Sequence, residues 1–223
     1  LAIQGQGRIF NQEASDRQLS TVSPFYEKAM RDFDAYLFIR APFNLRADQN
    51  NDPERNKIRQ AAYQPISKIY SQRTATRELR RNLCQYPTIA SAQNAGMSLE
   101  EYEHFVFNAC KLFADDPVAE WLQVREAQPA TVDLLNSREK IRYRGEGIDI
   151  TFSTKGRTWI NSDGQTNMPS GEVYTAPVDD SANGTVHFSH PAVYMGNEVE
   201  GVTLWVKDGY IEKWEAKRGQ EFL

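Results

Sequence analysis

The side chains that could carry chemistry begin with one acid in a turn-rich stretch. In the run NMPSGEVYTAP, residues 167–177, Glu172 directly follows a Pro-x-Gly sequence and begins an expected strand. It could be a solvated charge at the edge of a turn, as most acidic side chains are. Alternatively, Pro169 and Gly171 could direct the carboxylate inward, where desolvation costs several kcal/mol unless a cation or hydrogen-bond donors compensate. Because no basic residue alternates with Glu172, the inward-facing alternative predicts a metal ligand.

The three histidines are the other source of acid–base or metal chemistry. A candidate metal cluster combines Glu172 with side chains that follow it in the sequence, namely Asp179, Asp180, His187 and His190. The two histidines are three residues apart, so on one strand they would point to opposite faces and could share an ion only across a turn. The third, His104, lies on an expected helix, where a structural or exposed histidine is the simpler interpretation.

Common local signatures of catalysis and nucleotide binding are absent from the sequence. There is no G-x-G-x-x-G after a strand, no Walker-type loop, no G-x-S-x-G and no H-E-x-x-H. The stretch YRGEGID, residues 143–149, has two glycines, but no helix follows to hold a phosphate. It predicts a tight β-turn.

The elements that would position these residues begin with helices whose starts are marked by capping signals. Expected caps are Ser23 before Pro24, Asp52 before Pro53, Ser98 with Glu101, and Asp116 before Pro117. In the first helix, Phe25, Ala29 and Phe33 share one stripe and are predicted to face the core. The apolar run AYLFIR, residues 35–40, follows a helix and predicts a buried strand of a parallel sheet. After the next helix, the run ELRRNLCQYP, residues 78–87, is less apolar but also predicts a strand.

The pattern changes after residue 137 to apolar and polar residues that alternate between glycines. Hairpin turns are predicted at residues 162–164, 182–184, 195–197 and 207–209, with strands at 185–189, 201–206 and 210–216. The sequence therefore predicts an α/β (α+β) fold, with an incomplete N-terminal layered α/β region followed by a mainly antiparallel curved sheet. The expected domains are residues 1–137, with capped helices, and residues 138–223, rich in strands.

Composition indicates a globular protein of 223 residues with a net charge of −4. No stretch approaches the roughly 20 apolar residues that span a membrane, so we expect no membrane protein. The densest basic group is Arg73, Arg77, Arg80 and Arg81; this argues against a large nucleic-acid face but leaves one local anion site open. Cys84 and Cys110 lack C-x-x-C spacing and predict reduced thiols in a cytoplasmic protein.

The run NMPSGEVYTAP, with several blocks in matching order, resembles the thermophilic-aminopeptidase family of dinuclear metallopeptidases, of the aminopeptidase T and aminopeptidase S type. The other similar blocks are YPTIASAQNAGMSLEEYEHFVFNA (86–109), DDPVAEW (115–121), GEGIDITF and GRTWINSDG (within 145–164), and PAVYMGNEVEGVTLWVKDGYIEKWEAKRG (191–219). The similarity runs from about Tyr86 to the last residue, and from about Ser23 in architecture alone.

This resemblance implies an exopeptidase that removes N-terminal amino acids from peptides with two divalent ions, zinc or cobalt. The glutamate of the N-M-P-x-G-E motif is a metal ligand in the family, which maps onto Glu172; no other ligand is carried over. The resemblance also implies a homodimer. We expect both ends of the chain to belong to a longer protein that supplies the remaining ligands; the alternatives are a non-catalytic scaffold or a small-molecule binding module.

Overall fold

The computed structural model describes residues 6–49, 51–194 and 197–223, and the chain divides into two compact units. The first unit consists of Leu1–Cys110 with Gln165–Pro169, and the second of Lys111–Gly164 with Ser170–Leu223. The expected division at residue 137 follows the change in composition, whereas the units follow contacts in space. As a result, the helices between residues 117 and 136 are in the same unit as the strands that follow them.

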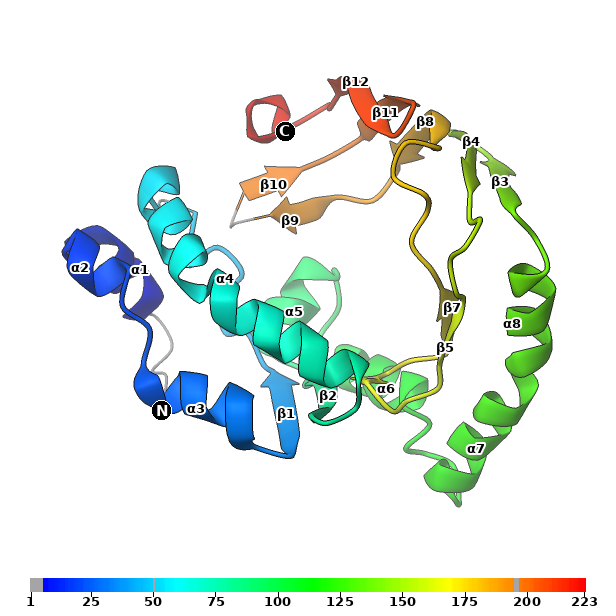
Figure 1. Ribbon diagram of the computed structural model, residues 1–223, viewed down its shortest axis with the longest axis horizontal. Coiled ribbons are helices and arrows are strands. Elements are labelled where there is room, and N and C mark those ends of the chain that lie inside the picture. Colours follow the sequence, from blue (N-terminus) through cyan, green and yellow to red (C-terminus); the bar gives the residue numbers. More distant parts are fainter. Residues whose placement is uncertain (1–5, 50, 195–196) are drawn as a thin grey trace. The chain divides into compact units, whose positions relative to one another are not determined.

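The first unit is built on a parallel sheet in the order β1 (Ala35–Arg40), β2 (Arg80–Gln85) and β6 (Asn167–Met168). Figure 1 labels the first two of these strands, β1 and β2. The strands predicted at 35–40 and 78–87 are confirmed. The third strand comes from the inserted segment Gln165–Pro169, far along the chain. The sheet of the first unit therefore depends on residues that lie between two parts of the second unit.

Two helices pack on one face of this sheet, α3 (Pro24–Asp32) and α4 (Pro53–Ala75). Their buried residues Met30 and Ile66 form a core with Leu79, against which Tyr36 and Tyr70 are partly buried. Ser23 and Asp52 occupy the predicted N-cap positions; the Asp52 side chain accepts from the Glu54 and Arg55 amides, whereas the Ser23 side chain makes no capping bond.

The apolar stripe predicted for the first helix is wrong. Phe25 is 85% exposed and Phe33 is 58% exposed, whereas Met30 is buried. The side of α3 that faces α4 carries Tyr26 and Met30, four residues apart, and Tyr26 meets Tyr63 of α4 edge to face. Helical spacing identified a stripe, but the position of α4 selects another one.

The burial predicted for β1 is also wrong. Leu37 and Ile39 are 61% and 57% exposed, although they belong to a nearly continuous apolar run. β1 is at the edge of the sheet, and Leu37 and Ile39 alternate with Tyr36, which packs on the core. Among the described residues, little covers the face that carries Leu37 and Ile39.

Two further helices of the first unit are α5 (Ile89–Asn94) and α6 (Leu99–Ala109). The capping box predicted at Ser98 and Glu101 is confirmed: the Ser98 amide donates to Glu101 at 2.8 Å, and the Glu101 amide donates to Ser98 Oγ at 3.2 Å. Cys110 follows α6, and burial raises the pKa of its thiol, with a smaller contribution from nearby Cys84 on β2. Neither cysteine forms a disulfide in the part of the chain that the structure describes.

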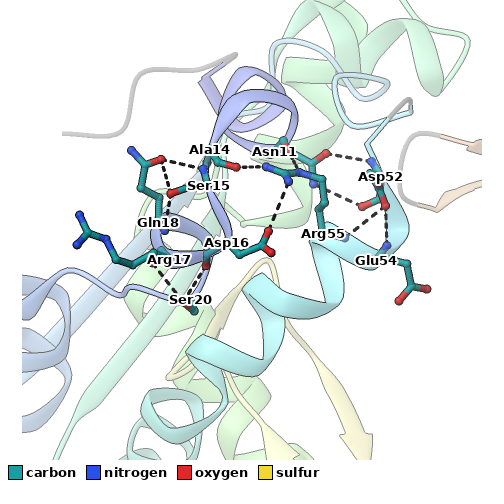
Figure 2. Close-up of polar contacts among 10 residues, drawn as sticks. All are labelled: Asn11, Ala14, Ser15, Asp16, Arg17, Gln18, Ser20, Asp52, Glu54 and Arg55. Carbon is teal, nitrogen blue, oxygen red and sulfur yellow. Dashed lines mark hydrogen bonds and ion pairs between the residues drawn. The ribbon is translucent and has the colours of Figure 1, made fainter.

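The N-terminal helices α1 (Gln6–Glu13) and α2 (Asp16–Leu19) are held to the start of α4 by polar contacts (Figure 2). The Arg55 guanidinium donates to the carbonyls of Asn11 and Ala14, at the end of α1. The buried Asn11 side chain also accepts a bond from the Asp52 amide at 2.9 Å. Arg55 therefore satisfies carbonyls that the end of α1 leaves unpaired.

The second unit contains α7 (Pro117–Ala127), α8 (Pro129–Asn136) and a five-stranded antiparallel sheet (Figure 1). In spatial order the sheet strands are β12 (Tyr210–Glu215), β11 (Val202–Lys207), β8 (Asn183–Phe188), β4 (Ile148–Ser153) and β3 (Lys140–Gly145). Two smaller antiparallel pairs are β5 (Ile160–Ser162) with β7 (Glu172–Tyr174), and β9 (Ala192–Tyr194) with β10 (Asn197–Val199); the 3₁₀ helix η1 (Gln220–Phe222) follows. The predicted α/β (α+β) fold class is confirmed, and no helix among the described residues is long and apolar enough to cross a membrane.

The predicted turns have different outcomes. The hairpin at 207–209 is confirmed, with Asp208 and Gly209 both at positive φ between β11 and β12. The turn at 182–184 is wrong because Gly184 lies within β8, where an added Cβ would be 2.1 Å from the Asp149 carbonyl oxygen. The glycine there permits close approach of two strands. Of the turn predicted at 195–197, residues 195 and 196 lie outside the described residues.

We expect Arg55→Ala to lower the free energy of unfolding by about 2 kcal/mol, because two carbonyls at the end of α1 lose a charged donor. Urea denaturation followed by circular dichroism measures this change. The matched control is Lys57→Ala on the same helix, whose exposed pair with Glu54 at 2.7 Å should contribute no more than about 0.5 kcal/mol. Equal losses in the two variants would contradict the role given to Arg55.

Hydrogen bonds from the Ser98 backbone and side chain hold the pKa of Glu101 below its ordinary value. A carboxylate with a depressed folded pKa contributes stability above the unfolded pKa and loses it as pH falls through the lower folded value. We expect Ser98→Ala to raise the pKa of Glu101 partway toward its ordinary value, since the backbone donor remains. Carboxyl-detected NMR titration measures both values, and a Glu101 pKa unchanged by the substitution would refute a contribution from the hydroxyl.

Candidate functional site

The motif around Glu172 connects the two units rather than forming a simple turn. Asn167 and Met168 form β6 and pair in parallel with Leu83 and Cys84 in the first unit. Glu172 begins β7 in the second unit and lies opposite Ser162 of β5. The hairpin turn predicted at 162–164 is therefore wrong, because the chain leaves β5, contributes a strand elsewhere and then returns as β7.

The return of the chain to β5 is held by three contacts with Ser162. Its carbonyl accepts bonds from the Gly171 amide and from Ser170 Oγ, both at 2.9 Å. Its hydroxyl lies 2.7 Å from the hydroxyl of Ser170, and Ser162 is 3% exposed. Gly171 has φ +105°, a conformation that side chains rarely adopt. We call Ser162, Ser170 and Gly171 the serine clasp; it fixes the backbone directly before Glu172.

Directly after Ser162, a buried acid ties the clasp to a helix. Arg125, in the last turn of α7, donates from Nε to Asp163 Oδ2 at 2.6 Å. The Asp163 side chain is 6% exposed, whereas that of Arg125 is 44% exposed. Removing one partner of such a pair leaves a buried charge uncompensated, which is strongly destabilising. Asn161 adds a bond from its side chain to the Arg125 carbonyl at 3.4 Å.

Glu172 itself is exposed at the start of β7. Among the described residues, its carboxylate has no hydrogen bond or ion pair. The structure thus shows a solvent-facing side chain, not the inward-facing one of the alternative interpretation. The Glu172 carboxylate is therefore available to bind a cation or an amine. The backbone that carries it is held in place by the serine clasp.

The histidines and neighbouring acids do not gather around Glu172. His187 Nδ1 lies 2.9 Å from Thr203 Oγ1 in the five-stranded sheet, and His190 is exposed after β8. Asp179 pairs with Arg157 at 3.0 Å.

Asp180 is exposed next to Asp179, and His104 is exposed on α6 in the first unit. Within the part of the chain that the structure describes, no three His, Cys, Asp or Glu side chains form a group that could hold a metal ion. The described residues therefore do not fit a metal site by themselves, since Glu172 is a single donor.

Comparison with models of protein families assigns the chain to a family. A family model described as thermophilic metalloprotease (M29) matches residues 3–223. The chain belongs to the M29 family. This confirms the resemblance inferred from the motif and its neighbouring blocks.

Individual relatives agree with the M29 assignment. The chain is 30% identical over 207 residues to Aminopeptidase 2 of Geobacillus stearothermophilus, covering 85% of this chain and 50% of that protein. It is 32% identical over 143 residues to Aminopeptidase AmpS of Bacillus subtilis (strain 168), covering 57% and 35%. The chain thus spans about half the length, or less, of these relatives.

A solved structure shows the same fold. Wild-type AmpT from Thermus thermophilus matches with a TM-score of 0.74 and 22% identity, over 98% of this chain and 59% of that one. The arrangement of elements described above is thus shared with this solved structure.

Sequence reasoning missed the serine clasp and the buried Asp163. Residues 162–164 read as a turn because Ser, Asp and Gly favour turns locally. The partner of Asp163 lies 38 residues earlier in the sequence, so no local pattern indicates the pair. The available signal was the Pro-x-Gly sequence, which did indicate a constrained backbone before Glu172.

We expect Ser162→Ala to lower the free energy of unfolding by about 1–2 kcal/mol, because the partly buried Ser170 hydroxyl loses a partner. Amide hydrogen exchange at Gly171 should also become faster if the clasp loosens. The control is Ser189→Ala, at an exposed position of the same unit, with a change within about 0.5 kcal/mol. Unchanged exchange at Gly171 in Ser162→Ala would show that the hydroxyl pair does not hold the return of the chain.

Proposed function

We propose that the complete protein is a metal-dependent aminopeptidase that removes N-terminal amino acids from peptides. The observation that carries this proposal is the match of the thermophilic metalloprotease model to residues 3–223. Relatives named as aminopeptidases in several bacteria support it. We further propose two divalent ions, zinc or cobalt, as the cofactors.

Glu172 is the metal ligand that we propose in this chain. Its position in the N-M-P-x-G-E motif supports the role, as do the exposure of its carboxylate and the absence of a partner among the described residues. The serine clasp supports it as well, because a ligand on a fixed backbone needs little ordering when it binds. The other ligands would come from outside the described residues, which group no further donors with Glu172.

We propose that the protein forms a homodimer and that it is located in the cytoplasm. Cys84 and Cys110 form no disulfide among the described residues, which supports a reducing compartment. The dimer rests on the resemblance to the aminopeptidase T and S type. We also keep residues 1–137 and 138–223 as proposed domains, the second being part of the metal-binding region.

We expect Glu172→Ala in the complete protein to reduce metal-dependent hydrolysis of a leucyl chromogenic substrate by about a hundredfold or more, because loss of one ligand impairs a metal centre worth several kcal/mol. Metal content, measured by elemental analysis after dialysis, should fall with it. Circular dichroism should be unchanged, since the Glu172 side chain has no partner among the described residues.

The control is Glu146→Ala, which removes an exposed acid from the β3–β4 turn of the same unit and should leave hydrolysis and metal content unchanged. Full activity and full metal content in Glu172→Ala would refute the ligand assignment alone. A wild-type protein that releases no N-terminal amino acid with zinc or cobalt would instead overturn the aminopeptidase proposal and favour a scaffold or binding module.

A further inference from the structure

The first unit contains a pocket that the proposed activity does not use. It has a volume of about 290 Å³ and lies between the sheet and the helices α3 and α4. The residues that line it are Tyr26, Tyr36, Phe38, Ser67, Tyr70, Arg81, Asn82 and Leu83. We call it the tyrosine pocket. The volume is at the lower end of the range of about 300–1,000 Å³ that is usual for small-molecule sites.

The tyrosine rings make rigid walls. Tyr36 and Tyr70 meet edge to face with ring centroids 5.8 Å apart, and Tyr26 meets Tyr63 in the same way at 5.6 Å. Both Tyr36 and Tyr70 also pack on the core of the unit. The pocket is therefore held open by side chains that the fold itself fixes.

The hydroxyls of this pocket are available as hydrogen-bond donors. Burial raises the pKa of Tyr26, and nearby Tyr36, Tyr63 and Tyr70 add to the effect, which keeps its phenol neutral. Tyr63 already accepts a bond from Arg59 at 2.7 Å. Among the described residues, the hydroxyls of Tyr26, Tyr36 and Tyr70 have no hydrogen-bond partner. Aromatic surface and free donors are thus combined in one cavity.

Arg81 supplies the charge of the pocket. It is half-buried on β2, and within the described part of the chain it has no acidic partner. Arg73, from the same basic group, differs because it donates to the carbonyls of Met30 and Phe33 at the end of α3. The adjacent Arg80 is exposed, and successive residues of a strand point to opposite faces. Arg81 is therefore the member of the group that lines the pocket, and no acidic side chain in the described part of the chain pairs with it.

We propose that the tyrosine pocket binds a small organic carboxylate, with its apolar or aromatic part against the tyrosine rings and its carboxylate against Arg81. A guanidinium pairs with a planar carboxylate through two parallel hydrogen bonds. A single arginine matches one negative charge, which favours a carboxylate over a doubly charged phosphate. The proposal makes no use of Glu172 or of the proposed peptidase activity.

Ligand-observed NMR on the complete protein tests this proposal with phenylacetate as the probe. The comparison probes are 2-phenylethanol, which has a similar shape without charge, and inorganic phosphate. We expect saturable binding of phenylacetate at millimolar concentration or below, and much weaker binding of the other two. No binding of phenylacetate, or equal binding of 2-phenylethanol, would overturn the proposal, as would preferential binding of phosphate.

Two neighbouring arginines give a matched pair of variants. We expect Arg81→Gln to weaken phenylacetate binding about tenfold or more, the effect of losing a charge-assisted hydrogen bond of about 1.5–3 kcal/mol. Arg80→Gln should change the affinity by less than about twofold, since a surface charge contributes little. Equal effects of the two substitutions would reject Arg81 as the anion contact.

A measurement on the unaltered protein keeps the test independent of how the variants fold. With tyrosine labelled in its ring, phenylacetate should shift the signals of Tyr26, Tyr36 and Tyr70. Tyr210, which is 75% exposed on β12, should not move. Equal shifts of all these signals would indicate non-specific association and would refute the pocket.

Discussion

The backbone of Ser162 is the point on which the rest of the Glu172 region depends. The chain leaves β5 at this residue, contributes β6 to another sheet, and must return beside the place it left. The carbonyl and hydroxyl of Ser162 receive the returning Ser170 and Gly171. Because Ser162 is buried, water molecules cannot compete for these hydrogen bonds, which are therefore stronger than they would be at the surface. The path of the six residues between Asp163 and Ser170 is thereby fixed at both ends.

Two carboxylates near this point have opposite surroundings. Asp163 is buried and compensated by Arg125, so its charge ties the segment that follows β5 to α7. Glu172, nine residues later, is exposed on a strand that the same contacts hold. The unit thus stabilises one charge inside and presents another at its surface. A ligand role suits the second carboxylate, since it is not already committed to a protein partner.

Local signals predicted much of the fold. Ser98 with Glu101, Asp52 before Pro53, and Asp116 before Pro117 mark helix starts because capping involves neighbouring residues alone. The turn at Asp208 and Gly209 was predictable for the same reason. The family resemblance also rests on ordered sequence blocks, one of which contains Glu172.

The remaining features depend on partners distant in sequence, which no local pattern contains. Phe25 has helical spacing with Phe33, yet α4 packs on the side of Met30. Gly184 resembles a turn residue, but it lies in β8 because the backbone of Asp149 comes close. Asp163 resembles another turn residue until Arg125 is placed beside it. Tyr26, Tyr36, Tyr70 and Arg81 come from four elements, so the tyrosine pocket appears only when the chain is folded.

The insertion of Gln165–Pro169 into the first unit has a consequence for synthesis on the ribosome. The strands β1 and β2 emerge early, but their third partner follows only after α7, α8 and the β3–β4 hairpin have been made. Domains generally fold as units during translation, N-terminal first. Until β6 has been made, Leu83 and Cys84 lack the strand that pairs with one edge of β2. The sheet of the first unit is therefore completed only after synthesis of the second unit has begun. The two units are therefore coupled in the order of their completion.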